Sequence, residues 1–171
     1  MNVKTVHAYF EILDDTLLGY RVPAWKKSAG RRMIETEKFY LFDVGVTNYL
    51  SRRRPAPGTP EFGLSFEQYI LMELKTWQAY RNPELEIRHW RSASGLEVDF
   101  ILGDMRLALE VKSSSRISYQ HLKGLRIIRD ECAVKKTVLV STETLPRTVD
   151  GIEILPWRIF IDNLWAGAYE L

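Results

Sequence analysis

The stretch 95-GLEVDFILGDMRLALEVK-112 decides the fold, because two short runs of alternating residues flank a turn. Alternation with a period of two is typical of β-strands, and the turn residues between the runs predict a β-hairpin over residues 95–112. If Leu102 pairs with Leu107, one face of this hairpin is entirely apolar. Its residues are Val98, Phe100, Leu102, Leu107, Leu109 and Val111.

The opposite face of the hairpin contains the charged residues. It carries Glu97, Asp99, Ile101, Ala108, Glu110 and Lys112. In the same register Asp99 lies directly opposite Glu110, whereas a two-residue turn keeps the two acids diagonal neighbours. Two carboxylates held a strand apart repel each other unless a proton or a cation lies between them.

A divalent metal ion is one such cation. Mg²⁺ prefers oxygen ligands and is often held by one or two carboxylates together with a substrate phosphate. We therefore expect Asp99 and Glu110 to bind Mg²⁺ or Mn²⁺, with Lys112 beside the attacking water and a phosphodiester oxygen, which is a hydrolytic geometry. The alternative is a hairpin whose outer face is solvated and whose Lys112 only offsets the acids.

Asp99, followed on the next strand by Glu110-Val111-Lys112, resembles the D…(D/E)-x-K signature of the PD-(D/E)XK nuclease superfamily. The segments FGLSFEQYILMEL, HWRSASGLEVDFIL and LALEVKSSS further resemble the nuclease-like C-terminal region of bacterial and archaeal AAA-type ATPases, the domain-of-unknown-function 4143 family. The resemblance covers roughly the last two thirds of the chain. Val98 stands where the superfamily usually has proline.

The resemblance implies a role for each matching residue. Asp99 and Glu110 would be metal ligands, Lys112 would orient the attacking water, and Glu67 would be the acid contributed by the preceding helix. The implied activity is hydrolysis of nucleic-acid phosphodiesters with Mg²⁺ or Mn²⁺, with DNA as the favoured substrate and the ATPase domain of the same family as a partner. Helical periodicity makes Glu73 a competitor of Glu67, because Glu73 lies within the apolar stripe and Glu67 at its margin.

Periodicity along the second part of the chain predicts alternating helices and strands. Helices are expected over Leu64–Tyr80, Ser118–Cys132 and Pro156–Tyr169, and strands over Glu86–Arg91, the two arms of the hairpin, Lys136–Ser141 and Ile152–Leu155. The order is αβββαβ with one extra strand. The expected fold class is therefore α/β, with a mixed sheet flanked by helices, and this is the order of the restriction-endonuclease-like core.

Residues 1–54 are predicted to be a separate unit, because a linker follows them. The linker consists of Arg52-Arg53-Arg54 and a proline-rich stretch to Pro60, in which neither a helix nor a strand can form. A helix over residues 3–13, strands over Thr16–Trp25 and Met33–Phe42, and a basic turn between them resemble the last helix and wing of a winged-helix domain. We expect residues 1–54 to be a partial winged-helix-like segment and residues 61–171 to be the nuclease-like domain.

The first helices of such a winged unit are absent, so the chain is expected to be a fragment. Its uncovered apolar faces should lead to self-association through residues 1–50 as a homo-oligomer.

Nucleic-acid contacts are expected from local groups of residues rather than from the overall charge. The 24 Lys and Arg residues and 22 Asp and Glu residues give a net charge of only +2. The candidates are Lys26, Lys27, Arg31 and Arg32 in the basic turn, Ser113 beside Lys112, and Gln120 and Lys123 at the start of the following helix. The simpler interpretation of the basic turn is a solvated loop.

Several classes of function are excluded or disfavoured. The single Cys132, expected in a buried helical position, excludes an internal disulfide, and no Cys or His spacing suggests zinc. The chain has no G-x-x-x-x-G-K-[ST] phosphate loop and therefore cannot hydrolyse ATP by that route. No apolar run reaches membrane-spanning length and no signal core is present, which predicts a cytoplasmic protein without a membrane partner.

Two alternatives to a nuclease remain at this point. One is a catalytically silent DNA-binding or oligomerisation module that regulates an attached ATPase, which the weak net charge favours. The other is an interaction protein with a charged hairpin face.

Overall fold

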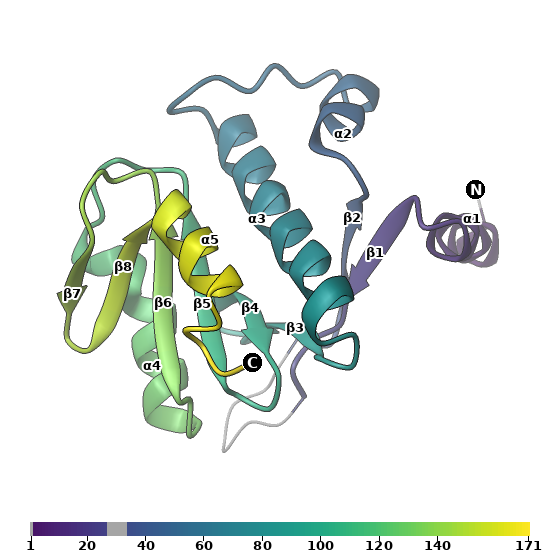
Figure 1. Ribbon diagram of the computed structural model, residues 1–171. Coiled ribbons are helices and arrows are strands. Elements are labelled where there is room, and N and C mark those ends of the chain that lie inside the picture. The colour runs from purple at the N-terminus through teal and green to yellow at the C-terminus, as the bar shows by residue number, and fades with distance from the viewer. Residues whose placement is uncertain (1, 27–33) are drawn as a thin grey trace.

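A six-stranded mixed sheet forms the centre of the protein, with the strand order β3-β4-β5-β6-β8-β7 (Figure 1). The computed structural model describes residues 2–26 and 34–171. The strands are β3 (Ile87–Arg91), β4 (Glu97–Leu102), β5 (Leu107–Lys112), β6 (Lys136–Ser141), β7 (Arg147–Val149) and β8 (Ile152–Pro156). Strands β3, β4 and β5 form an antiparallel meander, whereas β5, β6 and β8 run parallel. The predicted mixed α/β sheet is confirmed.

The edge strand β7 was not predicted. It has only three residues, none of which is buried, and it pairs antiparallel with β8. A strand without a buried side gives no hydrophobic alternation, so nothing in its sequence marks it. The sheet therefore extends beyond the αβββαβ order by two strands instead of one.

The register of the β4–β5 hairpin is the predicted one. Leu102 pairs with Leu107, and the ladder continues to the pair of Phe100 with Leu109. The regular ladder ends there, and the same register places Asp99 opposite Glu110 at the next step. The Asp99 side chain makes a further contact with the neighbouring strand, described below.

The predicted apolar face is also wrong for one residue, Val98. Arg88 pairs with Ile101 but Trp90 pairs with Val98, so Asp99 and Phe100 lie opposite a single residue of β3. This β-bulge reverses the alternation, and Val98 joins Ile101 on one side of the sheet while Phe100 lies on the other. A strict period of two cannot reveal one extra residue.

Helices cover both faces of the sheet (Figure 1). Helices α3 (Pro60–Arg81) and α5 (Trp157–Trp165) pack on one face, and the 3₁₀-helix η1 (Tyr119–Leu122) and helix α4 (Lys123–Glu131) on the other. The apolar residues that recur every three or four positions along α3 and along η1 and α4 are buried: Phe66, Ile70, Leu74 and Trp77 on one side, and Leu122, Leu125 and Ile128 on the other. Cys132 follows α4 and is half-buried, so the expectation of a buried helical cysteine is wrong.

Helix α4 approaches β4 so closely that its second residue has no room for a side chain. A Cβ atom built on Gly124 would lie 2.2 Å from the backbone oxygen of Glu97. Glycine at this position lets the helix lie directly on the strand, which helps to bury Val98.

The first part of the chain folds into helix α1 (Val3–Asp15), an antiparallel pair of strands β1 (Gly19–Val22) and β2 (Lys38–Leu41), and helix α2 (Val44–Leu50). The two strands are shorter than predicted. This part contacts the rest of the protein through backbone hydrogen bonds: Trp25 N donates to His89 O over 2.7 Å, and His89 N donates to Pro23 O over 2.9 Å. Its strands thus lie beside β3 and α3 (Figure 1).

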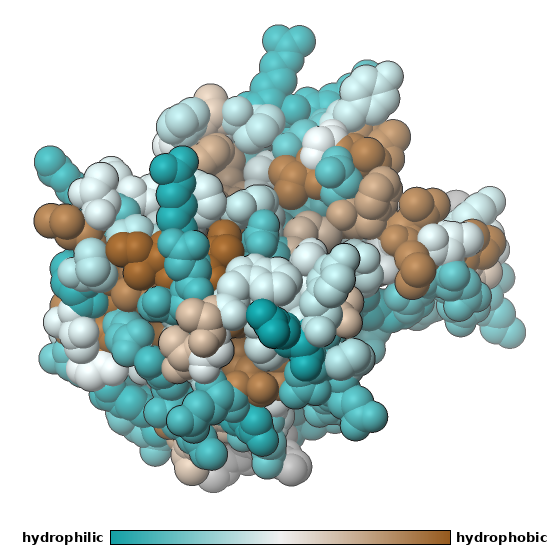
Figure 2. Space-filling model, viewed as in Figure 1, coloured by the Kyte–Doolittle hydropathy of each residue, from teal (hydrophilic) through white to brown (hydrophobic). Residues whose placement is uncertain are grey.

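Helix α1 lies at the outside of the protein and has no buried residue. Its side chains include Val3, Tyr9 and Ile12, which are 70%, 59% and 55% exposed. Figure 2 shows apolar surface over α2 and between β1 and α1. Among the described residues, no helix combines the length and the apolar character that crossing a membrane would require.

Candidate functional site

Asp99 and Glu110 are both buried, at 4% and 5% exposure, next to each other at the end of the β4–β5 hairpin. The bulge leaves Asp99 outside the regular β3–β4 pairing, and its Oδ2 accepts a hydrogen bond of 2.9 Å from the backbone N–H of Val111 on β5. The side chain of one acid therefore touches the backbone directly after the other. The interpretation of this face as simply solvated is wrong.

Burial makes the charged forms of these two acids unfavourable. Burial, followed by the charge of Glu67, raises the pKa of Asp99 to about 6, even though Lys38, Lys112 and the Val111 N–H act in the opposite direction. Burial, followed by the charge of Asp99, raises the pKa of Glu110 well above its usual value. Such a pair gains free energy from any additional cation that comes within reach.

Lys112 lies beside Glu110, with its ammonium paired to Glu110 Oε1. The other oxygen, Glu110 Oε2, is buried and has no hydrogen-bond donor. Burial lowers the pKa of Lys112, but Glu110 and Asp99 together raise it above its usual value, so the ammonium is retained. The side chain of Lys112 is still 35% exposed and can reach solvent.

Glu67, and not Glu73, is the acid that α3 brings to this cluster. Its Oε1 accepts a hydrogen bond from the hydroxyl of Tyr40 and lies 3.0 Å from Lys38 Nζ. Glu73 lies beside Tyr69 and raises the pKa of that phenol, after the effect of burial. The helix margin, rather than the centre of the apolar stripe, faces the acids.

Lys38 is the group that sequence reasoning missed. Its Nζ lies 2.6 Å from Glu97 Oε1, 3.0 Å from Glu67 Oε1 and 3.3 Å from Asp99 Oδ1. Burial lowers the pKa of Lys38, but Asp99 and Glu67 raise it to well above its usual value. Lys38 and Tyr40 alternate along β2 and so share a side, but nothing in the KFYL segment indicates acids 29 and 61 residues away.

The residues present fit a hydrated Mg²⁺ or Mn²⁺ ion. Among residues 2–26 and 34–171, no three His, Cys, Asp or Glu side chains form a metal-binding group. Mg²⁺ needs fewer protein ligands, because it keeps several waters and takes one or two carboxylates plus substrate phosphate. Asp99 and Glu110 supply two carboxylates, and the buried Glu110 Oε2 lacks any other partner.

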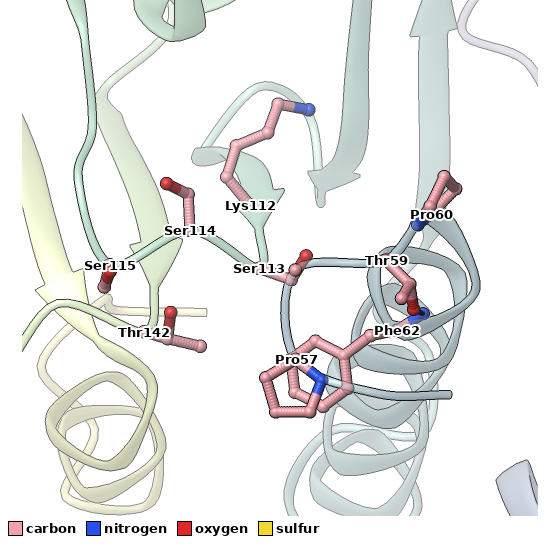
Figure 3. Close-up of a pocket in the computed structure, with 11 residues that line it drawn as sticks. Pro57, Thr59, Pro60, Phe62, Lys112, Ser113, Ser114, Ser115 and Thr142 are labelled. Carbon is pink, nitrogen blue, oxygen red and sulfur yellow. Dashed lines mark hydrogen bonds between the residues drawn. The ribbon is translucent and has the colours of Figure 1, made fainter. Parts of the chain in front are cut away.

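An open pocket of about 690 Å³ adjoins Lys112 (Figure 3). Lys112 and the loop Ser113–Ser115 line one side together with Thr142, and the first residues of α3 line the other. At that helix end Thr59 caps α3, its hydroxyl accepting from Phe62 N over 3.2 Å. The pocket thus combines several hydroxyls and a helix N-terminus, which can contact an anion, and the side chain of Lys112 lies at its edge with the ammonium directed away toward Glu110.

The other residues expected to contact nucleic acid do not join this pocket. Gln120 and Lys123 are exposed on η1 and α4. Lys26 lines a separate small pocket with Glu86, Arg88 and Asp104. Lys27, Arg31 and Arg32 lie outside the described residues.

The fold and the site define a mixed α/β protein with a buried acidic cluster at the end of a β-hairpin. A family model described as "Domain of unknown function (DUF4143)" matches residues 62–160, which is more than half of the chain, so the protein belongs to this family. A second model, described as "Domain of unknown function (DUF8612)", matches residues 1–56. No curated protein and no solved structure gave a match.

The two matched segments divide the acidic cluster between them. Glu67, Glu97, Asp99, Glu110 and Lys112 lie within 62–160, whereas Lys38 and Tyr40 lie within 1–56.

Proposed function

We propose that residues 61–171 form a metal-dependent nuclease domain of the PD-(D/E)XK superfamily. The order α3-β3-β4-β5-α4-β6 is the αβββαβ order of the restriction-endonuclease-like core, which β7 and β8 extend. The observation that carries the proposal is the buried pair of Asp99 and Glu110 beside Lys112. Two acids that burial makes hard to ionise are costly to a fold, and such groups cluster at functional sites.

In this proposal Asp99 and Glu110 hold Mg²⁺ or Mn²⁺. The bound ion would supply Lewis-acid activation of water and of the phosphoryl group. Lys112 orients the attacking water and offsets the charge that develops on the phosphate, because its ammonium already lies at Glu110 and its side chain reaches the pocket. Glu67 assists from α3.

The pocket beside Lys112 accommodates the sugar–phosphate backbone of the substrate. Hydroxyls of Ser113 and Thr142 and the N-terminus of α3 are suited to phosphate oxygens, and none of these groups reads a base. We therefore propose nucleic acid as the substrate, with DNA favoured, and an ATPase domain of the same family as the partner that presents it. Lys26, Gln120 and Lys123 would add contacts outside the pocket.

A catalytically silent module that regulates an attached ATPase is the second candidate. One observation favours it: the ammonium of Lys38 lies among the acids and already offsets part of their charge. The net charge of only +2 also provides no broad basic surface.

A cleavage assay separates the two candidates. Linear, branched and single-stranded DNA, and RNA, are incubated in Mn²⁺ with the wild type and with Asp99→Asn. The control variant is Asp104→Asn, which changes an exposed acid in the turn of the same hairpin. Cleavage by the wild type and the control but not by Asp99→Asn supports the nuclease. No cleavage of any substrate by the wild type favours the regulatory module.

A further inference from the structure

Lys38 belongs to the first part of the chain, but its side chain reaches the acidic cluster formed by the second part. Three carboxylates, those of Glu67, Glu97 and Asp99, lie within 3.3 Å of its Nζ. Most surface ion pairs join two groups, but this ammonium is shared by three acids from α3 and β4, and its side chain is only 20% exposed. Lys38 is therefore the internal counter-ion of the cluster.

The segment that carries Lys38 is held against the site by further contacts. Tyr40, two residues along β2, donates its hydroxyl to Glu67. Gln68 Nε2, on α3, donates to Leu41 O and to Thr47 Oγ1, each over 2.8 Å. These contacts fix β2 on α3, so the backbone that carries Lys38 is held beside the acids.

The two oxygens of Asp99 are used differently. Oδ2 accepts from Val111 N at 2.9 Å, which leaves Oδ1 for a cation, and Lys38 Nζ lies 3.3 Å from Oδ1. A divalent ion bound to Oδ1 would lie close to the ammonium and would repel it strongly in this buried place. Metal and ammonium are therefore alternatives at Asp99.

We propose that Lys38 is a built-in competitor of the divalent cation, so that metal enters the site only when the Lys38 ammonium leaves it. This inference rests on the proposed metal site of Asp99 and Glu110. It adds that the segment matched by the second family model regulates how readily the site is loaded. Because Lys38 has a flexible stem and is part-exposed, its ammonium can swing into solvent without unfolding β2.

The first test measures Mn²⁺ binding by titration calorimetry, without any assay of activity. Lys38→Met removes the ammonium and keeps the aliphatic stem. Its matched control is Lys136→Met on β6, which removes an ammonium that lies 3.1 Å from Glu153 Oε1 on β8 and changes the net charge equally. We expect Lys38→Met to bind Mn²⁺ at least about tenfold more tightly than the wild type, and the control to be unchanged. Equal affinity of all three proteins would overturn the inference.

The second test uses only the wild type, so it holds even if Lys38→Met fails to fold. Lysines are acetylated briefly at increasing Mn²⁺, and modification of Lys38 is quantified by mass spectrometry against Lys136. Displacement predicts that Lys38 becomes more reactive along the Mn²⁺ binding curve while Lys136 does not change. Tighter binding to Lys38→Met together with unchanged labelling of Lys38 would mean that the ammonium only adds positive potential, and would overturn the competition.

Failure of this inference can be told from failure of the nuclease proposal. Mn²⁺ binding that Asp99→Asn abolishes but Lys38→Met does not alter refutes the role of Lys38 and leaves the metal site standing. Absence of Mn²⁺ binding in the wild type and in Lys38→Met refutes both. Displacement of Lys38 by Mn²⁺ without any cleavage supports the inference and refutes only the nuclease.

Discussion

The Asp99 carboxylate accepts a hydrogen bond from the backbone N–H of Val111, 12 residues along the chain and directly after Glu110. A side chain here takes the place of a ladder carbonyl, which ends the regular pairing of β4 with β5 at Phe100 and Leu109. The acidic pair at the centre of the proposed site therefore depends on a local interruption of the sheet and not on its regularity.

Asp99→Asn should abolish stabilisation by Mn²⁺. A ligand at about one hundred times its Kd stabilises the native state by about 2.7 kcal/mol, which for a domain of this size raises the Tm by about 5 to 10 °C. We expect this rise in the wild type and in the Asp104→Asn control, and none in Asp99→Asn, when melting is followed by differential scanning fluorimetry. A wild type that melts at the same temperature with and without Mn²⁺ would contradict the ligand assignment.

Lys112→Ala should lower turnover by a factor on the order of one hundred while Mn²⁺ affinity hardly changes, because the ammonium acts mainly on charge that develops during the reaction. Single-turnover cleavage and calorimetry measure the two quantities separately. Lys135→Ala, which changes an exposed lysine before β6, is the control. Equal turnover of the wild type and Lys112→Ala would remove Lys112 from the mechanism.

The free energy of unfolding of the metal-free protein should contain a pH-dependent contribution from Asp99. The folded state holds this proton more tightly than the unfolded chain does, since the pKa rises from 3.8 to about 6. The contribution to stability is therefore fully present below about pH 3.8 and is lost as the pH rises through 6, which amounts to about 3 kcal/mol. Urea unfolding from pH 4 to 7 should show a larger loss in the wild type than in Asp99→Asn, in which only the buried Glu110, whose pKa is also raised, still contributes. Parallel curves for the two proteins would contradict it.

Gly124→Ala should destabilise the protein by about 1 to 3 kcal/mol, because the new Cβ atom would meet the Glu97 carbonyl at 2.2 Å and push α4 away from β4. Gly63→Ala is the control in another helix. Its Cβ atom would lie 3.4 Å from Ser113 Oγ, so the gain in helix propensity of up to about 1 kcal/mol should appear. Urea midpoints of the two variants that shift in the same direction would argue against the close helix–strand contact.

The exposed apolar side chains of α1 should cause self-association. Ile12 is 55% exposed on a helix that has no buried residue. We expect the wild type to show a concentration-dependent mass in sedimentation equilibrium, and Ile12→Gln to remain monomeric at higher concentration, since burial of the isoleucine drives the contact. Glu11→Gln, a neighbouring polar change, should behave like the wild type. A wild type that stays monomeric over a wide concentration range would exclude this contact.

Alternation and helical periodicity were enough to predict the hairpin register, the inward faces of α3 and α4 and the buried parallel strand β6, because each of these depends on a repeat within one element. The same reasoning failed for Val98, since one extra residue in β4 leaves no trace in the pattern. It also failed for β7, which buries nothing. Lys38 was missed for another reason: its partners Glu67, Glu97 and Asp99 come from elements that only tertiary packing brings together.

The bulge also indicates how relatives of this protein should be compared. Without the extra residue, Asp99 would alternate with Ile101 and point toward α4, away from Glu67, while the ladder would become more regular. Deletion of a single residue in β4 would therefore remove the site and at the same time improve the sheet. In an alignment, a one-residue gap in this strand would mark a relative without the proposed site more surely than replacement of any one acid, because no compensating substitution restores the direction of the side chain.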